Sequence, residues 1–170
     1  PGDVRQCLVA LSSSPKVRDL FNYRFEEGSM KGHAFGNLFM AALEKMTGSF
    51  ADAVETASNV LSVKGHVYPI TLDDTKLIMH RENGSETRGQ FESAYVQLDE
   101  GERPFLTLDP VAQLNPRARE AILKADLIVI APGHLYGSLA PALIVSGLTH
   151  ALKKSKAKKE TEEEMNLRLA

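Results

Sequence analysis

The chain has 170 residues, of which 43% are hydrophobic and 25% are charged, and its formal net charge is −2. This length and composition are typical of one globular domain with a sizeable core, so we predict a single α/β domain over residues 1–170. The charge gives no electrostatic reason to expect nucleic acid or an anionic membrane as a partner. No apolar run approaches the ~20 residues of a membrane helix, which argues against a membrane span.

Cysteine usage indicates a reducing compartment. Cys7 is the only cysteine, which excludes an intrachain disulfide, and the sequence shows no signal peptide. We therefore expect a cytoplasmic protein. Because Cys7 lies in an apolar run, we expect it to be a small buried hydrophobe rather than a catalytic thiol.

The chain begins at Pro1-Gly2, without a methionine, in a stretch typical of a loop that enters a helix. Apolar residues at 4, 7, 8 and 11 keep helical spacing, and Asp3 precedes them as a candidate N-cap. A doubly wound domain normally carries its first strand and its phosphate-binding turn near the N-terminus. We therefore expect a fragment that lacks an N-terminal strand and a glycine-rich loop.

Three further helices are expected before residue 65. Apolar spacing predicts a short helix around residues 17–25, a second from about 36 to 46, and a third that starts at Ser49 with a capping box. Gly36 and Asn37 lie in the first turn of the second helix, although both are poor helix formers. Their presence indicates that this turn needs a close backbone approach or an amide side chain.

From residue 65 to about residue 108 the pattern changes to short extended runs. These runs cover residues 67–71, 76–80, 90–96 and 105–108, and turn-forming residues separate them. Pro69 restricts the first run to an edge or to the start of a strand. We predict a β-rich, partly antiparallel section here.

The next stretch has the pattern of a helix, a strand, a loop and a second helix. Asn115-Pro116 is a strong helix start. Residues 126–131 have too few polar residues to face water on either side, so we predict a central strand of a parallel sheet with helices on both faces. Pro132 and Gly133 end this strand, and an apolar helix is expected over residues 139–152.

The loop after this strand is the candidate ligand site. In open α/β sheets ligands bind at such loops, because unpaired backbone N–H groups and the helix dipole point at them. We therefore expect the amides from Gly133 onward, together with Ser138, to bind a phosphate-bearing anion. The alternative is that Pro132 and Gly133 only turn the chain and that Ser138 only caps the helix. Tyr136 either stacks on a ligand ring or closes the core.

The end of the chain departs from the expected order of elements. Residues 160–170 have the pattern of a short acidic helix, although a parallel strand is expected after the basic end of the preceding helix. Either the chain ends in a helix, or residues are missing between Lys159 and Glu160. We favour the omission.

Three separated segments resemble one family. They are PGDVRQCLVAL at residues 1–11, GHAFGNL at 32–38 and ADLIVIAPGHLYGS at 125–138. In this order they resemble the bacterial gluconeogenesis factor proteins, which belong to the wider 2-phospho-L-lactate transferase (CofD-like) family. The resemblance covers most of residues 1–152.

The resemblance implies a Rossmann-like α/β fold, an open and mainly parallel sheet flanked by helices, with the β-rich section at about 65–108. In the gluconeogenesis factor branch it implies a pocket for a UDP-sugar and a regulatory role in carbon metabolism and cell-wall morphogenesis. In the transferase branch it implies transfer of a phospholactyl-type group in coenzyme F420 biosynthesis, with Mg²⁺. The opening and the loop after the central strand resemble the first branch, which we rank ahead. The family also suggests a homodimer.

The family motifs place candidate ligand-binding residues in both halves of the chain. They are Asp3, Arg5, Gln6, His33, Asn37, Pro132, Gly133, His134, Tyr136 and Ser138. Asp3 could hold a ligand hydroxyl or a metal, Arg5 could pair with a phosphate, and His33 and Asn37 could bind a base or a sugar. The alternatives are that Asp3 caps a helix, that Arg5 is solvated, and that His33 and Asn37 are turn residues.

The chain departs from the family pattern at four positions. It has Gln6 where the family has Asn, Ala131 for Gly, His134 for Ser and Gly137 for Thr. The last three lie in the loop itself, so they bear on the geometry of a bound phosphate and not on the fold. They also support a third hypothesis, a scaffold domain with a vestigial pocket.

Other chemistries find no support in the spacing of residues. No catalytic triad is visible, the five histidines lack the spacing of a zinc site, and neither the P-loop nor the dinucleotide fingerprint is present. We therefore expect a binding protein rather than an enzyme.

Overall fold

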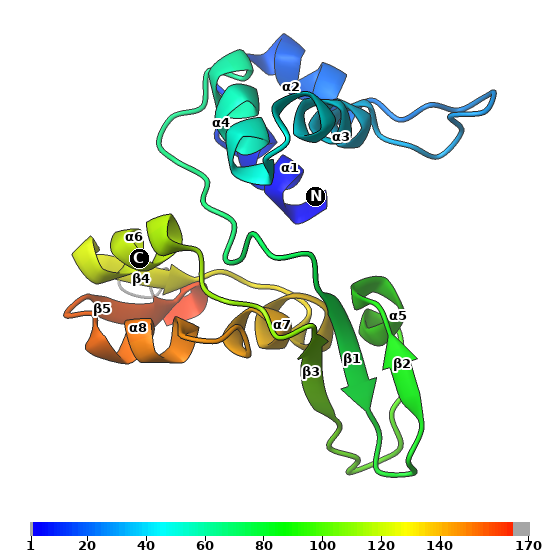
Figure 1. Cartoon of the computed structure of the whole chain (residues 1–170), viewed down its shortest axis with the longest axis vertical. Coiled ribbons are helices and arrows are strands. Elements are labelled where there is room, and N and C mark those ends of the chain that lie inside the picture. Colours follow the sequence, from blue (N-terminus) through cyan, green and yellow to red (C-terminus); the bar gives the residue numbers. More distant parts are fainter. Residues whose placement is uncertain (1, 165–170) are drawn as a thin grey trace. The chain divides into compact units, whose positions relative to one another are not determined.

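The computed structural model of the chain describes residues 2–164. Its internal contacts divide the chain into two compact units, Pro1–Pro69 and Ile70–Ala170. The first unit is helical and the second contains the strands (Figure 1). The assignment of residues 1–170 to one domain stays a prediction.

Four helices build the first unit. They are α1 (Gly2–Ala10), α2 (Pro15–Asn22), α3 (Phe35–Thr47) and α4 (Phe50–Val60). All four were expected from apolar spacing. Half of the predicted capping box is confirmed, because the Ser49 side chain accepts a hydrogen bond from the Asp52 amide at 3.3 Å, whereas the Ser49 amide donates to Thr47 Oγ1 instead of to Asp52. Asp3 lies within the first turn of α1 instead of preceding the helix. Cys7 is exposed, so the expectation that it is buried is wrong.

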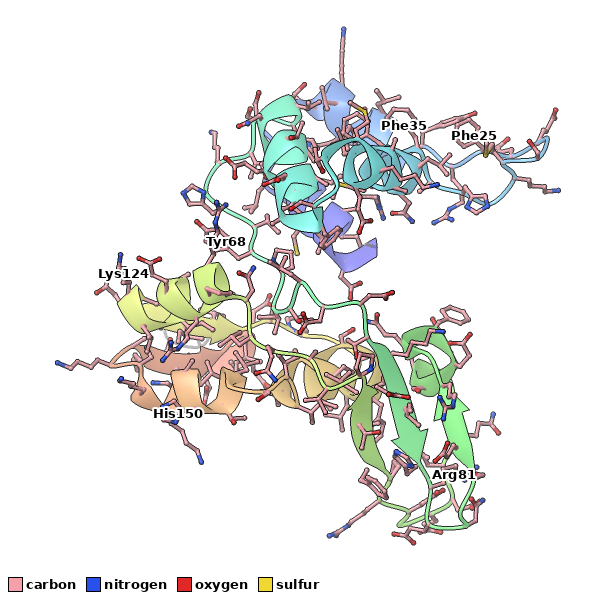
Figure 2. The ribbon with its side chains drawn as sticks, in the orientation of Figure 1. Phe25, Phe35, Tyr68, Arg81, Lys124 and His150 are labelled. Carbon is pink, nitrogen blue, oxygen red and sulfur yellow. The ribbon has the colours of Figure 1, made fainter. Side chains whose placement is uncertain are left out.

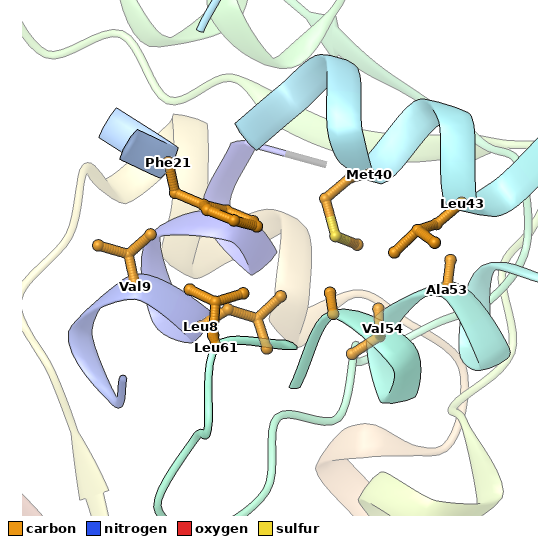
Figure 3. Close-up of a cluster of buried hydrophobic side chains, with 9 residues drawn as sticks. Leu8, Val9, Phe21, Met40, Leu43, Ala53, Val54 and Leu61 are labelled. Atoms are coloured by element: carbon orange, nitrogen blue, oxygen red, sulfur yellow. The ribbon is translucent and has the colours of Figure 1, made fainter. Parts of the chain in front are cut away.

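The four helices share one hydrophobic core, shown in Figure 3. Its buried members are Leu8, Val9, Phe21, Met40, Leu43, Ala53, Val54, Ala57 and Leu61. Phe21 is the aromatic centre, and its ring meets those of Phe35 and Phe39 edge-on at centroid distances of 5.7 and 5.0 Å. Each large side chain in this set contributes about 1.5–3 kcal/mol by leaving water.

The second unit begins with a three-stranded antiparallel sheet of order β2-β1-β3. Its strands are β1 (Lys76–His80), β2 (Glu86–Arg88) and β3 (Phe105–Asp109). Leu77, Ile78 and Met79 of the middle strand β1 are all buried. The predicted antiparallel section is therefore confirmed at β1 and β3, while β2 was not expected.

Arg81 joins the β1–β2 turn to the loop before β3 (Figure 2). Its Nε donates to Glu102 Oε1 at 2.8 Å and its Nη2 lies 3.3 Å from Asp99 Oδ2. The hydrogen bond from Arg81 lowers the pKa of the Glu102 carboxyl from its ordinary value of 4.5 to about 2. This ion pair fixes the end of the sheet.

Two predicted strands of this section are wrong. Residues 67–71 form no strand, and the run at 90–96 contains the helix α5 (Gln90–Ala94). The alternation of Phe91 and Tyr95 with smaller residues resembled a strand, but the small Ser93 is the buried residue and both aromatic rings are exposed. The spacing of four between the rings is that of one helix face.

A second sheet pairs β4 (Leu127–Ile130) with β5 (Lys158–Thr161) in parallel. The register runs without a gap from Ile128 opposite Lys159 to Val129 opposite Glu160. Residue 160 therefore lies in a strand and not in the expected acidic helix, while the omission between Lys159 and Glu160 stays a prediction. The rest of the expected acidic helix, from residue 165, lies outside the described residues.

β4 is not the buried central strand that its composition predicts. Leu127, Val129 and Ile130 are all exposed. Within residues 2–164, β4 pairs with β5 alone, so only one of its edges is occupied. The helices α6 (Pro116–Lys124) and α8 (Leu148–Lys154) accompany this sheet, and the Asn115 side chain caps α6 as expected. The chain is therefore a mixed α/β protein with Rossmann-like character.

The expected helix over residues 139–152 is broken into pieces. The π-helical turn η1 (Leu135–Leu139) passes into α7 (Ala140–Leu143), and α8 begins after an interruption. At the interruption Ser146 pairs in parallel with Gln113, and its amide donates to the Ala112 carbonyl at 2.9 Å. Apolar composition alone did not reveal this break.

Candidate functional site

The loop after β4 is organised by His134. Its backbone is extended, and its Nδ1 accepts a hydrogen bond from the Gly137 amide at 3.2 Å. The amides of Ser138 and Leu139 both donate to the His134 carbonyl, at 2.8 and 3.1 Å. His134 thus caps the turn that follows, a role that short polar residues usually have at helix starts.

This capping corrects the expectation that every amide from Gly133 onward is available to a ligand. The amides of residues 137–139 are bonded to His134 within the protein. The cap is His134 and not Ser138, whose side chain is exposed. The amides of Leu135 and Tyr136 open the turn, and among the described residues neither has a hydrogen-bond acceptor. Any anion at this loop would therefore meet these two amides and the Ser138 hydroxyl.

The helix α5 packs directly against η1 through Gly137. A Cβ atom at Gly137 would lie 2.7 Å from the Ala94 Cβ, and the Gln90 side-chain amide donates to the Gly137 carbonyl. Only a residue without a side chain allows this approach. The contact with α5 thus accounts for the glycine at position 137.

Two aromatic residues lie in or directly after this small helix, Phe91 within α5 and Tyr95 at its C-cap, and both were missed by sequence reasoning. Phe91 and Tyr95 are 72% and 71% exposed, and their ring centroids lie 4.8 Å apart. Exposed rings offer faces on which a planar ligand group can stack. Their spacing of four residues was the signal that could have placed them on one helix face. Tyr136, in contrast, is partly buried.

In the first unit Arg5 is turned inward. The residue is only 7% exposed, and its Nη1 donates to Asn22 Oδ1 at 2.7 Å and to the Phe21 carbonyl at 3.4 Å. A Cβ atom at Gly36 would lie 2.8 Å from Arg5 Cδ and 2.7 Å from the Phe21 carbonyl oxygen. The predicted need for a close approach at Gly36 is therefore confirmed, and the approaching groups are Arg5 and the end of α2.

Arg5 and Asn37 each keep one buried polar atom without a partner. These atoms are Arg5 Nε and Asn37 Oδ1, for which no hydrogen bond is found in the described part of the chain. An unsatisfied buried donor or acceptor costs about 1–3 kcal/mol, so such groups call for an explanation. Asp3, Gln6 and the His33 side chain are exposed.

The structure thus brings the candidate residues together in two separate groups. In the first unit, Arg5 lies against the turn that carries Gly36 and Asn37. In the second, Gly133, His134, Tyr136 and Ser138 share the loop before and within η1. Among residues 2–164, no three His, Cys, Asp or Glu side chains are grouped as they would be around a metal ion. No helix within the same range has the length and apolarity needed to cross a membrane.

These features define a mixed α/β protein with a candidate anion-binding turn after a parallel strand. The chain belongs to the family described as 2-phospho-L-lactate transferase CofD, whose model matches residues 1–161. It is 42% identical over 162 residues to a protein of Halalkalibacterium halodurans named gluconeogenesis factor, covering 94% of this chain and 49% of that protein. A gluconeogenesis factor of Listeria innocua is 39% identical over 161 residues, with the same coverage.

A solved structure supports the assignment. The crystal structure of a UPF0052 family protein of Bacillus halodurans matches with a TM-score of 0.84 and 40% sequence identity. The match covers 95% of this chain and 52% of that one. The chain thus spans about half the length of the curated relatives it matches.

Proposed function

We propose that this protein binds a UDP-sugar in the cytoplasm and acts, like a gluconeogenesis factor, as a regulator of carbon metabolism and cell-wall morphogenesis. Its relatives named gluconeogenesis factor support the general role. The observation that carries the ligand class is the turn at η1, where the amides of Leu135 and Tyr136 and the Ser138 hydroxyl lie within one helical turn. Backbone amides at such a start favour phosphate oxygens.

The surroundings of η1 suit a nucleotide better than a bare phosphate. Phe91 of α5 and Tyr95 at its C-cap expose their rings, and α5 is held to η1 at Gly137. Stacking of a base on an aromatic ring contributes about 1–3 kcal/mol. The diphosphate would meet η1 while the base stacks on α5.

Calorimetric titration with UDP-N-acetylglucosamine tests the proposal. We expect saturable heat with the wild-type protein and a loss of affinity in Ser138→Ala, because a hydroxyl donor to the phosphate is removed. The matched control is Ser29→Ala, a substitution of another exposed loop serine. Absence of heat at near-millimolar ligand would contradict the proposal. Unchanged affinity in Ser138→Ala would favour a vestigial pocket at η1.

The family description supports a second candidate, a transferase that moves a phospholactyl-type group onto a deazaflavin alcohol. Incubation of the protein with Mg²⁺, a nucleotide-activated phospholactate and the deazaflavin acceptor tests it. Formation of the phosphodiester product would establish that the protein is a transferase. If no product forms and the protein binds the UDP-sugar, the regulatory role is supported instead.

A further inference from the structure

Three polar side chains on one face of the antiparallel sheet form a row of close polar contacts. His80 Nδ1 lies 3.1 Å from Glu86 Oε1, and His80 Nε2 lies 2.8 Å from Thr107 Oγ1. Each residue comes from a different strand. In the register, His80 faces Glu86, while Thr107 faces Ile78, two residues before His80. Side chains two apart share a face, so all three lie on the same side of the sheet.

The chemistry of these contacts sets the direction of the hydrogen bonds. The Glu86 carboxylate lies beside Nδ1, and its negative charge favours the imidazole proton on that nitrogen. In the neutral ring Nε2 is then an acceptor, and the Thr107 hydroxyl donates to it. An activated nucleophile has three parts. They are a hydroxyl, a base within hydrogen-bond reach of it, and a third group that orients the base.

The neighbouring side chains leave Thr107 reachable and shield the base. Thr107 is exposed, whereas the His80 side chain is 22% exposed. The Phe105 ring stacks on His80 at a centroid distance of 4.4 Å with an interplanar angle of 7°. One face of the imidazole is therefore covered by an apolar ring, while the hydroxyl that it contacts remains open to a small molecule.

A cation spans the same face. The Arg88 guanidinium lies 3.5 Å from Glu86 Oε2 and 3.8 Å from Asp109 Oδ2, so it extends from β2 to β3 across β1. Arg88 and Thr107 both face Ile78, from opposite sides. A positive charge in this row can stabilise negative charge that develops beside Thr107.

We propose that Thr107 is the nucleophile of a second site, which accepts an acyl group from a small activated ester. The Thr107 oxygen forms a bond to the acyl carbon, the bond from that carbon to the leaving alcohol oxygen breaks, and the threonine proton passes to His80 Nε2 and then to the leaving oxygen. His80 is the base, Glu86 is a positioning residue, and Arg88 faces the developing oxyanion. The site is independent of the proposed nucleotide site.

The test uses the full chain and p-nitrophenyl acetate. We expect a burst of p-nitrophenolate and one acetyl group on the peptide that contains Thr107, found by mass spectrometry. Thr107→Val abolishes this label, and His80→Gln slows the burst by about 10²- to 10⁴-fold, the usual contribution of a general base. The matched control is Thr87→Val, which removes a hydroxyl from the opposite face of the same sheet, where Thr87 faces Met79.

The variant Glu86→Gln tests whether Glu86 positions His80 or only stabilises the fold. We expect it to slow the burst and change its pH profile, because the neutral amide no longer attracts the proton to Nδ1, while the melting temperature stays close to that of the wild type. The proposal is overturned if the wild-type protein gives no burst, if the acetyl group lies on lysine residues or His80 instead of Thr107, or if Thr87→Val and Thr107→Val lose the label equally.

Discussion

Replacement of Gly36 by alanine is the sharpest test of the packing in the first unit. The new Cβ atom would lie 2.7 Å from the Phe21 carbonyl oxygen and 2.8 Å from Arg5 Cδ. Ordinary van der Waals contact begins at 3.4 Å, so the carbonyl would have to move by about 0.7 Å. This carbonyl accepts a hydrogen bond from Arg5 Nη1, which restrains it.

Two opposing effects set the size of the change. Overpacking of this kind costs about 1–3 kcal/mol. Alanine gains up to about 1 kcal/mol over glycine in a helix. We therefore expect Gly36→Ala to lower the free energy of unfolding by about 0–2 kcal/mol, and by about 1–3 kcal/mol relative to a glycine-to-alanine change in a helix that meets no neighbour.

Urea unfolding followed by circular dichroism at helical wavelengths measures this change. The control is Gly2→Ala, because Gly2 lies in the first turn of α1 and a Cβ atom there meets nothing within 4 Å. Equal or higher stability of Gly36→Ala relative to Gly2→Ala would refute the close approach of Arg5 and Phe21.

Three further predictions concern the second unit. Gly137→Ala should push α5 away from η1, because the new Cβ would lie 2.7 Å from the Ala94 Cβ. It should therefore weaken UDP-sugar binding in a calorimetric titration, and unchanged binding would contradict the contact. Tyr95→Ala should weaken UDP-sugar binding about tenfold but leave pyrophosphate binding unchanged, and equal losses for both ligands would argue against stacking. Glu102→Gln should destabilise the protein at neutral pH. Because Arg81 holds the pKa of Glu102 at about 2, the stabilisation exists above its ordinary pKa of 4.5 and is lost as the pH falls toward 2. Melting curves of the two proteins should therefore converge on acidification, and a constant difference would contradict the role of the ion pair.

The periodicity of apolar residues located most helices and strands, because it indicates which face of each element is buried. The helices α1 to α4 bury regular apolar stripes, β1 is a short buried apolar run, and β3 alternates between more and less exposed residues. The helix α5 was missed because it exposes its large residues and buries Ser93, so apolar periodicity indicated the wrong element. The composition of β4 also misled, because an apolar strand is buried only where other elements cover it.

The sequence pointed to a candidate loop but did not reveal the hydrogen bonds within it. The loop at residues 132–138 was found from the order of strand, turn and helix, but the capping of Gly137 by His134 depends on a side-chain conformation that no spacing reveals. The contacts among Glu86, His80 and Thr107 could not be predicted from the sequence for a related reason. These residues are 27 or fewer positions apart in no recognisable motif, and only the register of three strands aligns them.

The exposed strand β4 has a consequence for the behaviour of the chain in solution. Its apolar side chains face water, and within residues 2–164 one of its edges has no strand beside it. A backbone edge of this kind is a template on which another extended peptide can assemble. At high concentration the chain should therefore self-associate through this strand, and a lysine in place of Val129 should keep it dispersed.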